Sequence, residues 1–98
     1  MSKQYLLSID NGTQSIRAII FDKNGLELAK STIPITPYFS TQAGWAEQDP
    51  IYFWESVCKA TNKLWKQTKI QKSDIKAVSV TTQRATIVTL DDKGKPLR

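Results

Sequence analysis

A short polar stretch, Asp10–Ser15, combines residue types that can bind phosphate groups. It reads Asp-Asn-Gly-Thr-Gln-Ser and lies between two apolar runs that are typical of strands. A tight turn between strands can direct successive backbone N–H groups at one point, which creates an anion-binding nest. Gly12 would allow the backbone to approach a phosphate closely because it has no Cβ, and Thr13 and Ser15 would add hydroxyl donors. The spacing alone leaves open both a phosphate cradle and a plain Asn-Gly hairpin with a satisfied Asp10 beside it.

Two charged side chains at this turn extend the phosphate interpretation. Asp10 stands at the end of the first predicted strand, where its carboxylate could hold Mg²⁺ through the water shell that this ion retains. Arg17, in the next predicted strand, could reach a phosphate oxygen. In this interpretation the turn is a site for phosphates and a magnesium ion.

Two later stretches also carry candidate residues. Gly44–Pro50 reads Gly-Trp-Ala-Glu-Gln-Asp-Pro and predicts a loop that leads into a helix, with Trp45 packing the loop down. Thr82–Thr86 follows a predicted strand, at the kind of position where α/β folds hold ligand groups. Within it, Arg84 could hydrogen-bond the hydroxyls of a substrate with its fixed fork of donors. The alternative is an exposed arginine at a turn.

The opening third of the chain predicts a three-stranded antiparallel meander that would position the first candidate site. Its strands are expected at residues 5–10, 15–22 and 26–35, the first of them buried. Asn11-Gly12 predicts a two-residue hairpin turn because both residues accept positive φ, and a Lys-Asn-Gly turn joins the second and third strands.

A helix is expected from Pro50 to about Gln67, because Asp49 can cap it and proline suits its first position. The residues of its expected buried face are Phe53, Trp54, Val57, Cys58, Leu64 and Trp65. A strand at 75–82 should then return beside the first strand, and a further hairpin should begin around residues 91–94. The predicted order is β-β-β-α-β followed by a β-hairpin. The last residues, Leu97-Arg98, would fall within the second strand of that hairpin, so the chain is expected to be a piece of a longer protein.

Composition indicates an ordinary globular chain of 98 residues with a formal net charge of +5. Its one cysteine, Cys58, excludes an internal disulfide, and the absence of histidine leaves no ligand set for zinc. A mild basic cluster is interpreted as a solvated helix end, since a nucleic-acid surface would need a denser stripe. Its members are Lys66, Lys69, Lys72 and Lys76. The apolar runs are too short for a signal peptide or a membrane span, so the cytoplasm is the expected location.

Ile9–Ala18 resembles the first phosphate motif of the sugar kinases that are related to actin and Hsp70. Its Ser-x-Arg-Ala continuation, followed by Phe21-Asp22 and a glycine turn, is more similar to FGGY carbohydrate kinases than to chaperone ATPases. Gly44–Pro50 is also similar to a Gly-Trp-x-Glu-x-Asp-Pro stretch that many FGGY kinases carry at this distance. The resemblance implies an α/β, ribonuclease H-like (actin-like ATPase) fold. Residues 1–98 would be the incomplete N-terminal part of an FGGY kinase domain, with the rest of it and a C-terminal domain further along.

The same resemblance implies roles for the candidate residues of the first turn. The residues implied to hold ATP through its phosphates are Asp10 (through Mg²⁺), Gly12, Thr13, Gln14, Ser15 and Arg17. Gln14 departs from the threonine common in the family, which removes a hydroxyl donor but still allows a hydrogen bond.

The stretch after the fourth predicted strand bears on the substrate. Glycerol kinases carry Asn-Gln-Arg-Glu at a similar place, and Gln83 and Arg84 match it as implied substrate-binding residues. Ala85 stands where that stretch has glutamate, so an acceptor for substrate hydroxyls is missing and glycerol itself is in doubt. The Gln-Met-His of xylulokinases is absent too. The implied substrate is therefore a polyol, a ketopentose or another small sugar.

The resemblance implies that a longer protein transfers the γ-phosphoryl group of ATP to such a hydroxyl, with Mg²⁺. The catalytic base and the adenine pocket would lie outside these residues, so the isolated segment is expected to be inactive. No nucleic-acid or membrane partner is expected, and a homo-oligomer stays open. The rival hypotheses are a non-catalytic actin-like ATPase or chaperone-type module and a small nucleic-acid-binding module.

Overall fold

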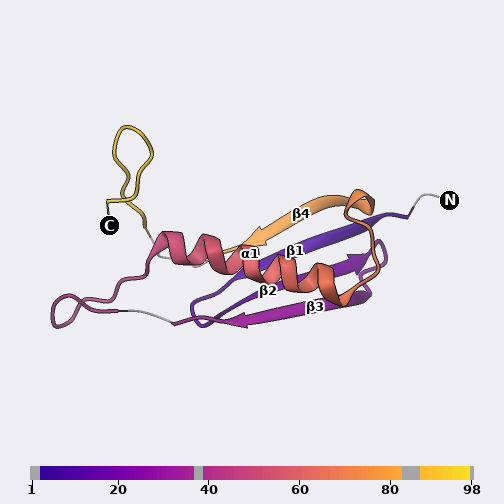
Figure 1. Cartoon of the computed structure of the whole chain (residues 1–98), viewed down its shortest axis with the longest axis horizontal. Coiled ribbons are helices and arrows are strands. Elements are labelled where there is room, and N and C mark those ends of the chain that lie inside the picture. The colour runs from indigo at the N-terminus through magenta and orange to yellow at the C-terminus, as the bar shows by residue number, and fades with distance from the viewer. Residues whose placement is uncertain (1–2, 37–38, 83–86, 98) are drawn as a thin grey trace.

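The computed structural model of the chain describes residues 3–36, 39–82 and 87–97. One helix packs across one face of a four-stranded sheet (Figure 1). The elements in chain order are β1 (Tyr5–Asn11), β2 (Ser15–Asp22), β3 (Glu27–Pro34), α1 (Pro50–Gln67), the 3₁₀ turn η1 (Lys72–Asp74) and β4 (Ile75–Thr81). This arrangement confirms the predicted α/β class and the predicted order through the fourth strand.

The sheet is mixed and has the order β3-β2-β1-β4. The β1–β2 and β2–β3 pairs are antiparallel, which confirms the predicted meander. After the helix crosses over, β4 pairs with β1 in parallel, so the ends of β1 and β4 lie at the same edge of the sheet. The register passes from Tyr5 opposite Ile75 to Leu6 opposite Ala77, which leaves one extra residue on β4.

The core lies between α1 and the middle strand of the meander. Ile16, Ala18 and Ile20 of β2 are fully buried, because alternate residues of a strand face the same side. Ala60 and Leu64 of α1 are fully buried in the same cluster. These contacts fix the helix over the sheet that carries the candidate site.

The helix covers the sheet unevenly, with most of its contacts to β2 and β3 and fewer to β1. Val78 and Val80 of β4 are consequently 56% and 57% exposed. The expectation of a wholly buried first strand is also wrong. Only Leu7 of β1 is buried, and Leu6, which points to the face opposite the helix, is 43% exposed.

The helix begins and ends where the sequence predicts, and its predicted buried face is confirmed apart from one residue. The buried residues Ser56, Ala60 and Leu64 recur every four positions and therefore share one side of the helix. Trp54, assigned to the buried face from sequence, is 66% exposed. It stands two residues before Ser56, about 200° around the helix axis, so it points toward solvent.

Asp49 caps this helix, as the sequence predicts. Its Oδ1 accepts a hydrogen bond of 3.0 Å from the backbone N–H of Ile51, one of the donors that a helix start leaves unpaired. We expect Asp49→Ala to lower the free energy of unfolding by about 1 kcal/mol. Asp49→Asn should keep most of the stability, because asparagine caps as well as aspartate. Urea denaturation of the two variants tests this, and equal losses would contradict the capping role.

The loop before the helix differs from its prediction at Trp45. That side chain is 42% exposed rather than packed down. The loop is instead closed by its backbone, since Phe39 and Glu47 exchange two N–H to carbonyl hydrogen bonds of 2.8 Å. Backbone pairing therefore helps to hold this loop, whose Trp45 side chain is only partly covered.

The predicted last hairpin forms its turn but little of its ladder. The backbone N–H of Asp91 donates to the carbonyl oxygen of Lys95 at 2.9 Å. In the described residues 87–97, Leu90 and Pro96 form an isolated bridge rather than paired strands. Pro96 occupies a non-hydrogen-bonded position of this bridge, and the Leu97 N–H donates to the Thr89 carbonyl oxygen at 2.8 Å on its other side. Within the described parts of the chain, no helix has the length and apolar character needed to cross a membrane.

Candidate functional site

The loop between β1 and β2 is held by a close backbone approach at Gly12. The Gly12 N–H donates a hydrogen bond of 3.1 Å to the carbonyl oxygen of Ser15. A Cβ at Gly12 would lie 3.0 Å from that oxygen, which is tighter than ordinary contacts. The predicted two-residue turn at Asn11-Gly12 is wrong, because neither residue has positive φ and the strands are joined by a longer loop. Glycine is needed here for space, not for a left-handed backbone.

The neighbouring elements hold the loop through its own carbonyl groups. The side-chain amide of Gln48 donates to the Thr13 carbonyl oxygen at 3.4 Å, and the Ile35 N–H donates to the Gln14 carbonyl oxygen at 3.0 Å. The side chains of Thr13 and Gln14 are exposed. Hydrogen bonds from residues next to α1 and β3 therefore hold the backbone of the loop, while its side chains stay available to a ligand.

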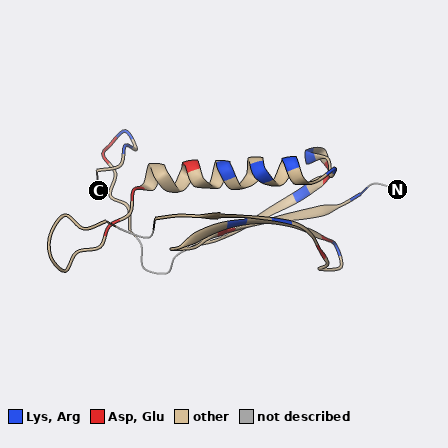
Figure 2. Cartoon of the chain, turned by 60° about the horizontal axis from the view of Figure 1, so that its bottom comes forward, with Lys and Arg blue, Asp and Glu red and all other residues tan. Residues whose placement is uncertain are grey.

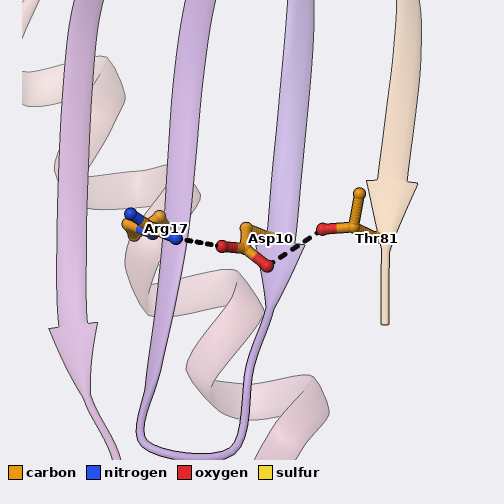
Figure 3. A network of polar contacts seen from close by, with 3 residues as sticks. All are labelled: Asp10, Arg17 and Thr81. Carbon is orange, nitrogen blue, oxygen red and sulfur yellow. Dashed lines mark hydrogen bonds and ion pairs between the residues drawn. The ribbon is translucent and has the colours of Figure 1, made fainter. Parts of the chain in front are cut away.

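Asp10, Arg17 and Thr81 come from three adjacent strands and meet on the face opposite the helix (Figure 3). Arg17 forms an ion pair with Asp10 Oδ2, directly across the antiparallel β1–β2 pair. Thr81 donates a hydrogen bond of 2.9 Å from Oγ1 to Asp10 Oδ1, across the parallel β1–β4 pair. Both carboxylate oxygens thus have partners, and the Asp10 side chain is still 34% exposed.

These partners stabilise the charged form of Asp10. The hydrogen bond from Arg17 and, next, the hydrogen bond from Thr81 hold the pKa of the Asp10 carboxyl below its ordinary value of 3.8, against the opposing effect of burial. At neutral pH the sheet edge therefore presents a partly exposed, ionised carboxylate beside a guanidinium and the Gly12 loop.

The donor set fits a magnesium ion that is held through water. The ion favours carboxylates and keeps several of its waters, and Asp10 is ionised and open to solvent. In the described residues, no group of three or more Asp, Glu, Cys or His side chains could enclose a metal directly. A single carboxylate that acts through the water shell is the arrangement these residues allow.

The Asp10 network should add stability that depends on pH. The folded-state pKa lies below the ordinary value, so the contribution is complete above 3.8 and is lost as the pH falls through the folded-state pKa. As the pH is lowered below about 4, we expect the free energy of unfolding to fall less for Asp10→Asn than for the natural chain. Urea denaturation at a series of pH values measures this difference, and identical pH slopes would contradict it.

The contacts of three residues at the site are not foreseen from the sequence. Thr81 is found only once the β1–β4 register is known, although its place at the end of a predicted strand is a signal. Gln48 lies in the predicted loop but gives no sign of its contact with Thr13. The buried Oδ1 of Asn11 accepts no hydrogen bond within the described residues, a feature that no sequence pattern reveals. The substrate candidates Gln83 and Arg84 lie outside the described residues.

The chain is similar to proteins of known activity along nearly its whole length. A family model described as the FGGY family of carbohydrate kinases, N-terminal domain, matches residues 5–98. A glycerol kinase of Lactobacillus acidophilus is 43% identical over 98 residues, which cover 99% of this chain and 19% of that protein.

Solved structures share the fold as well as sequence. The xylulose kinase of Rhodospirillum rubrum has a TM-score of 0.81 and 32% identity, over 97% of this chain and 19% of that one. The Plasmodium falciparum glycerol kinase, solved with ADP, has a TM-score of 0.76 and 26% identity, over 98% of this chain and 19% of that one. The chain therefore spans 19% of the length of each of these relatives.

Proposed function

Because the chain belongs to the FGGY family of carbohydrate kinases, we propose that the whole protein transfers the γ-phosphoryl group of ATP to a hydroxyl of a small sugar or polyol. The observation that carries this proposal is the Gly12 loop, whose close backbone approach would crowd any side chain at Gly12 and which adjoins the ionised Asp10. The rest of the protein would contribute the catalytic base and the adenine pocket, since this chain spans 19% of its relatives. We place the reaction in the cytoplasm, where ATP is available.

The loop is proposed to bind the phosphates of ATP. A relative solved with ADP supports a nucleotide as the ligand. The backbone and exposed side chains of Thr13 and Gln14, with the hydroxyl of Ser15, would donate hydrogen bonds to phosphate oxygens. Fixed donors of this kind stabilise the transferring group without reorganisation during the reaction.

Arg17 is proposed to bind a phosphate oxygen of the nucleotide, and Asp10 is proposed to bind its metal ion. A guanidinium has five N–H donors, and the contact with Asp10 uses Arg17 Nη2, so other donors remain for a phosphate oxygen. Asp10 would hold a Mg²⁺ ion through its water shell. When bound, this ion would neutralise negative charge on the β- and γ-phosphates. The pairing with Arg17 keeps Asp10 ionised for that task.

The family assignment favours a kinase over the chaperone-type ATPase that the hairpin alone leaves open. The substrate of the whole protein is proposed to be a small polyol or ketose, because the relatives include a glycerol kinase and a xylulose kinase. Ala85 supplies no carboxylate to accept a hydrogen bond from a glycerol hydroxyl, so a substrate other than glycerol is proposed.

A coupled assay of the complete protein with Mg-ATP and a panel of polyols, ketopentoses and aldoses tests the proposal. We expect turnover with at least one of them. With glycerol, we expect the natural protein to turn over more slowly than the Ala85→Glu variant. ATP binding without turnover on any member of the panel would instead support the non-catalytic module.

A further inference from the structure

The positive charge of the chain is concentrated at one place. Residues 59–76 contain six lysines and one aspartate, a net charge of +5 that equals the formal charge of the whole chain. Figure 2 shows these cations along α1 and around the turn that follows it. Acidic and basic residues balance elsewhere in the sequence. The charge excess therefore belongs to one surface rather than to the chain at large.

A hollow of about 590 Å³ opens in this surface, at the C-terminal end of α1. Its lining residues are Trp65, Thr68, Lys69, Ile70, Gln71, Lys72 and Ser73. The turn precedes Ile75, which pairs with Tyr5 at the start of β1, whereas the Gly12 loop follows the end of β1. The hollow and the proposed nucleotide loop thus lie at opposite ends of the strand.

In the parts of the chain that the structure describes, the cations at the hollow form no ion pair with an acidic side chain. Lys72 Nζ lies 5.6 Å from the centroid of the Trp65 ring, a cation–π contact that leaves its N–H donors free for an anion. Among the described residues, neither Lys69 Nζ nor the Ser73 hydroxyl takes part in a hydrogen bond or ion pair. Two ammonium groups and one hydroxyl therefore line a concave surface without an anionic partner.

From these observations we propose that the hollow binds a phosphate-bearing anion. Lys69 and Lys72 supply the positive charge, and Ser73 supplies a hydroxyl donor. The hollow is shallow and open to solvent, so it suits a small anionic group rather than an enclosed ligand. The phosphate group can come from a soluble phosphate ester or from a lipid headgroup. The site is independent of the proposed kinase reaction, because it shares no residue with the Gly12 loop.

The test uses the complete protein and the paired variant Lys69→Gln/Lys72→Gln. The matched control is Lys59→Gln/Lys66→Gln, which removes the same charge from α1 outside the hollow. Inorganic phosphate is titrated while the indole N–H resonance of Trp65, assigned with Trp65→Phe, is followed by NMR. Sedimentation with phosphatidylglycerol vesicles forms the second arm. Phosphate at the Gly12 loop would not move the Trp65 signal in this way, since that loop lies at the other end of β1.

We expect phosphate to shift the Trp65 resonance in the natural protein. The dissociation constant should rise about tenfold in the Lys69/Lys72 variant, and by no more than about twofold in the control. If the Lys69/Lys72 variant loses vesicle binding, the control keeps it, and free phosphate gives no shift, the hollow would be assigned to a lipid headgroup. Equal weakening in both variants, or no response to either probe, would overturn the proposal.

Discussion

Asp10→Asn should lower the kcat of the complete protein by about 10²–10³-fold, the size of effect seen when one preorganised electrostatic group is lost. The amide oxygen can still accept the hydrogen bond from Thr81, so the local structure is kept. The negative charge that would hold Mg²⁺ and pair with Arg17 is lost. A coupled kinase assay with the best substrate of the panel measures kcat, and thermal unfolding confirms that the variant folds.

The matched control for this prediction is Asp22→Asn, the same change at the end of β2, opposite Tyr5 at the start of β1. Asp22 Oδ1 accepts hydrogen bonds from the N–H groups of Asn24 and Leu26, and an amide oxygen can accept both. We expect its kcat to stay within about twofold of the natural protein. Equal kcat values for the two variants would show that Asp10 has no special part in phosphoryl transfer.

Leu64→Ala should lower the free energy of unfolding by about 2–5 kcal/mol. Leu64 is fully buried between α1 and the sheet, in one cluster with Ile16 and Ile20. Its truncation removes buried methyl groups and leaves a cavity that the packed strands can fill only in part. Urea denaturation of the complete protein, followed by circular dichroism, measures the loss.

Trp54→Ala is the control that separates burial from side-chain size. The tryptophan is larger than leucine, but it is 66% exposed on the same helix. We expect its removal to change the free energy of unfolding by no more than about 0.5 kcal/mol. A loss as large as that of Leu64→Ala would contradict the orientation of the helix described above.

Most element boundaries were predictable because their signals are local. The helix start is indicated by two adjacent residues, Asp49 as the cap and Pro50 as the first helical residue. The structure places the helix at Pro50–Gln67. The antiparallel meander follows from short turns between apolar runs. The exposure of Trp54 was less predictable, since this residue is apolar and next to the buried face, and only the packing against the sheet decides where that face ends.

The candidate site was predictable in its residue types but not in its contacts. The sequence indicates Asp10 and Arg17 as separate ligands for metal and phosphate, whereas the structure pairs them with each other. That pairing depends on strand register, which joins residues seven positions apart. The hydrogen bond from Thr81 depends on a parallel strand 71 positions further along, and no local pattern specifies such a pair.

The extra residue near the start of β4 decides which chemical group stands beside Asp10. Lys76 falls between the partners of Tyr5 and Leu6, and this shift brings Thr81 opposite Asp10. If Lys76 were kept and the pairing ran on from Tyr5 and Ile75 without the shift, Val80 would take that place. The carboxylate would then stand beside an isopropyl group that cannot donate a hydrogen bond. Loss of this shift should therefore change the site more than most single substitutions in β4, whereas deletion of Lys76 itself would keep Thr81 opposite Asp10.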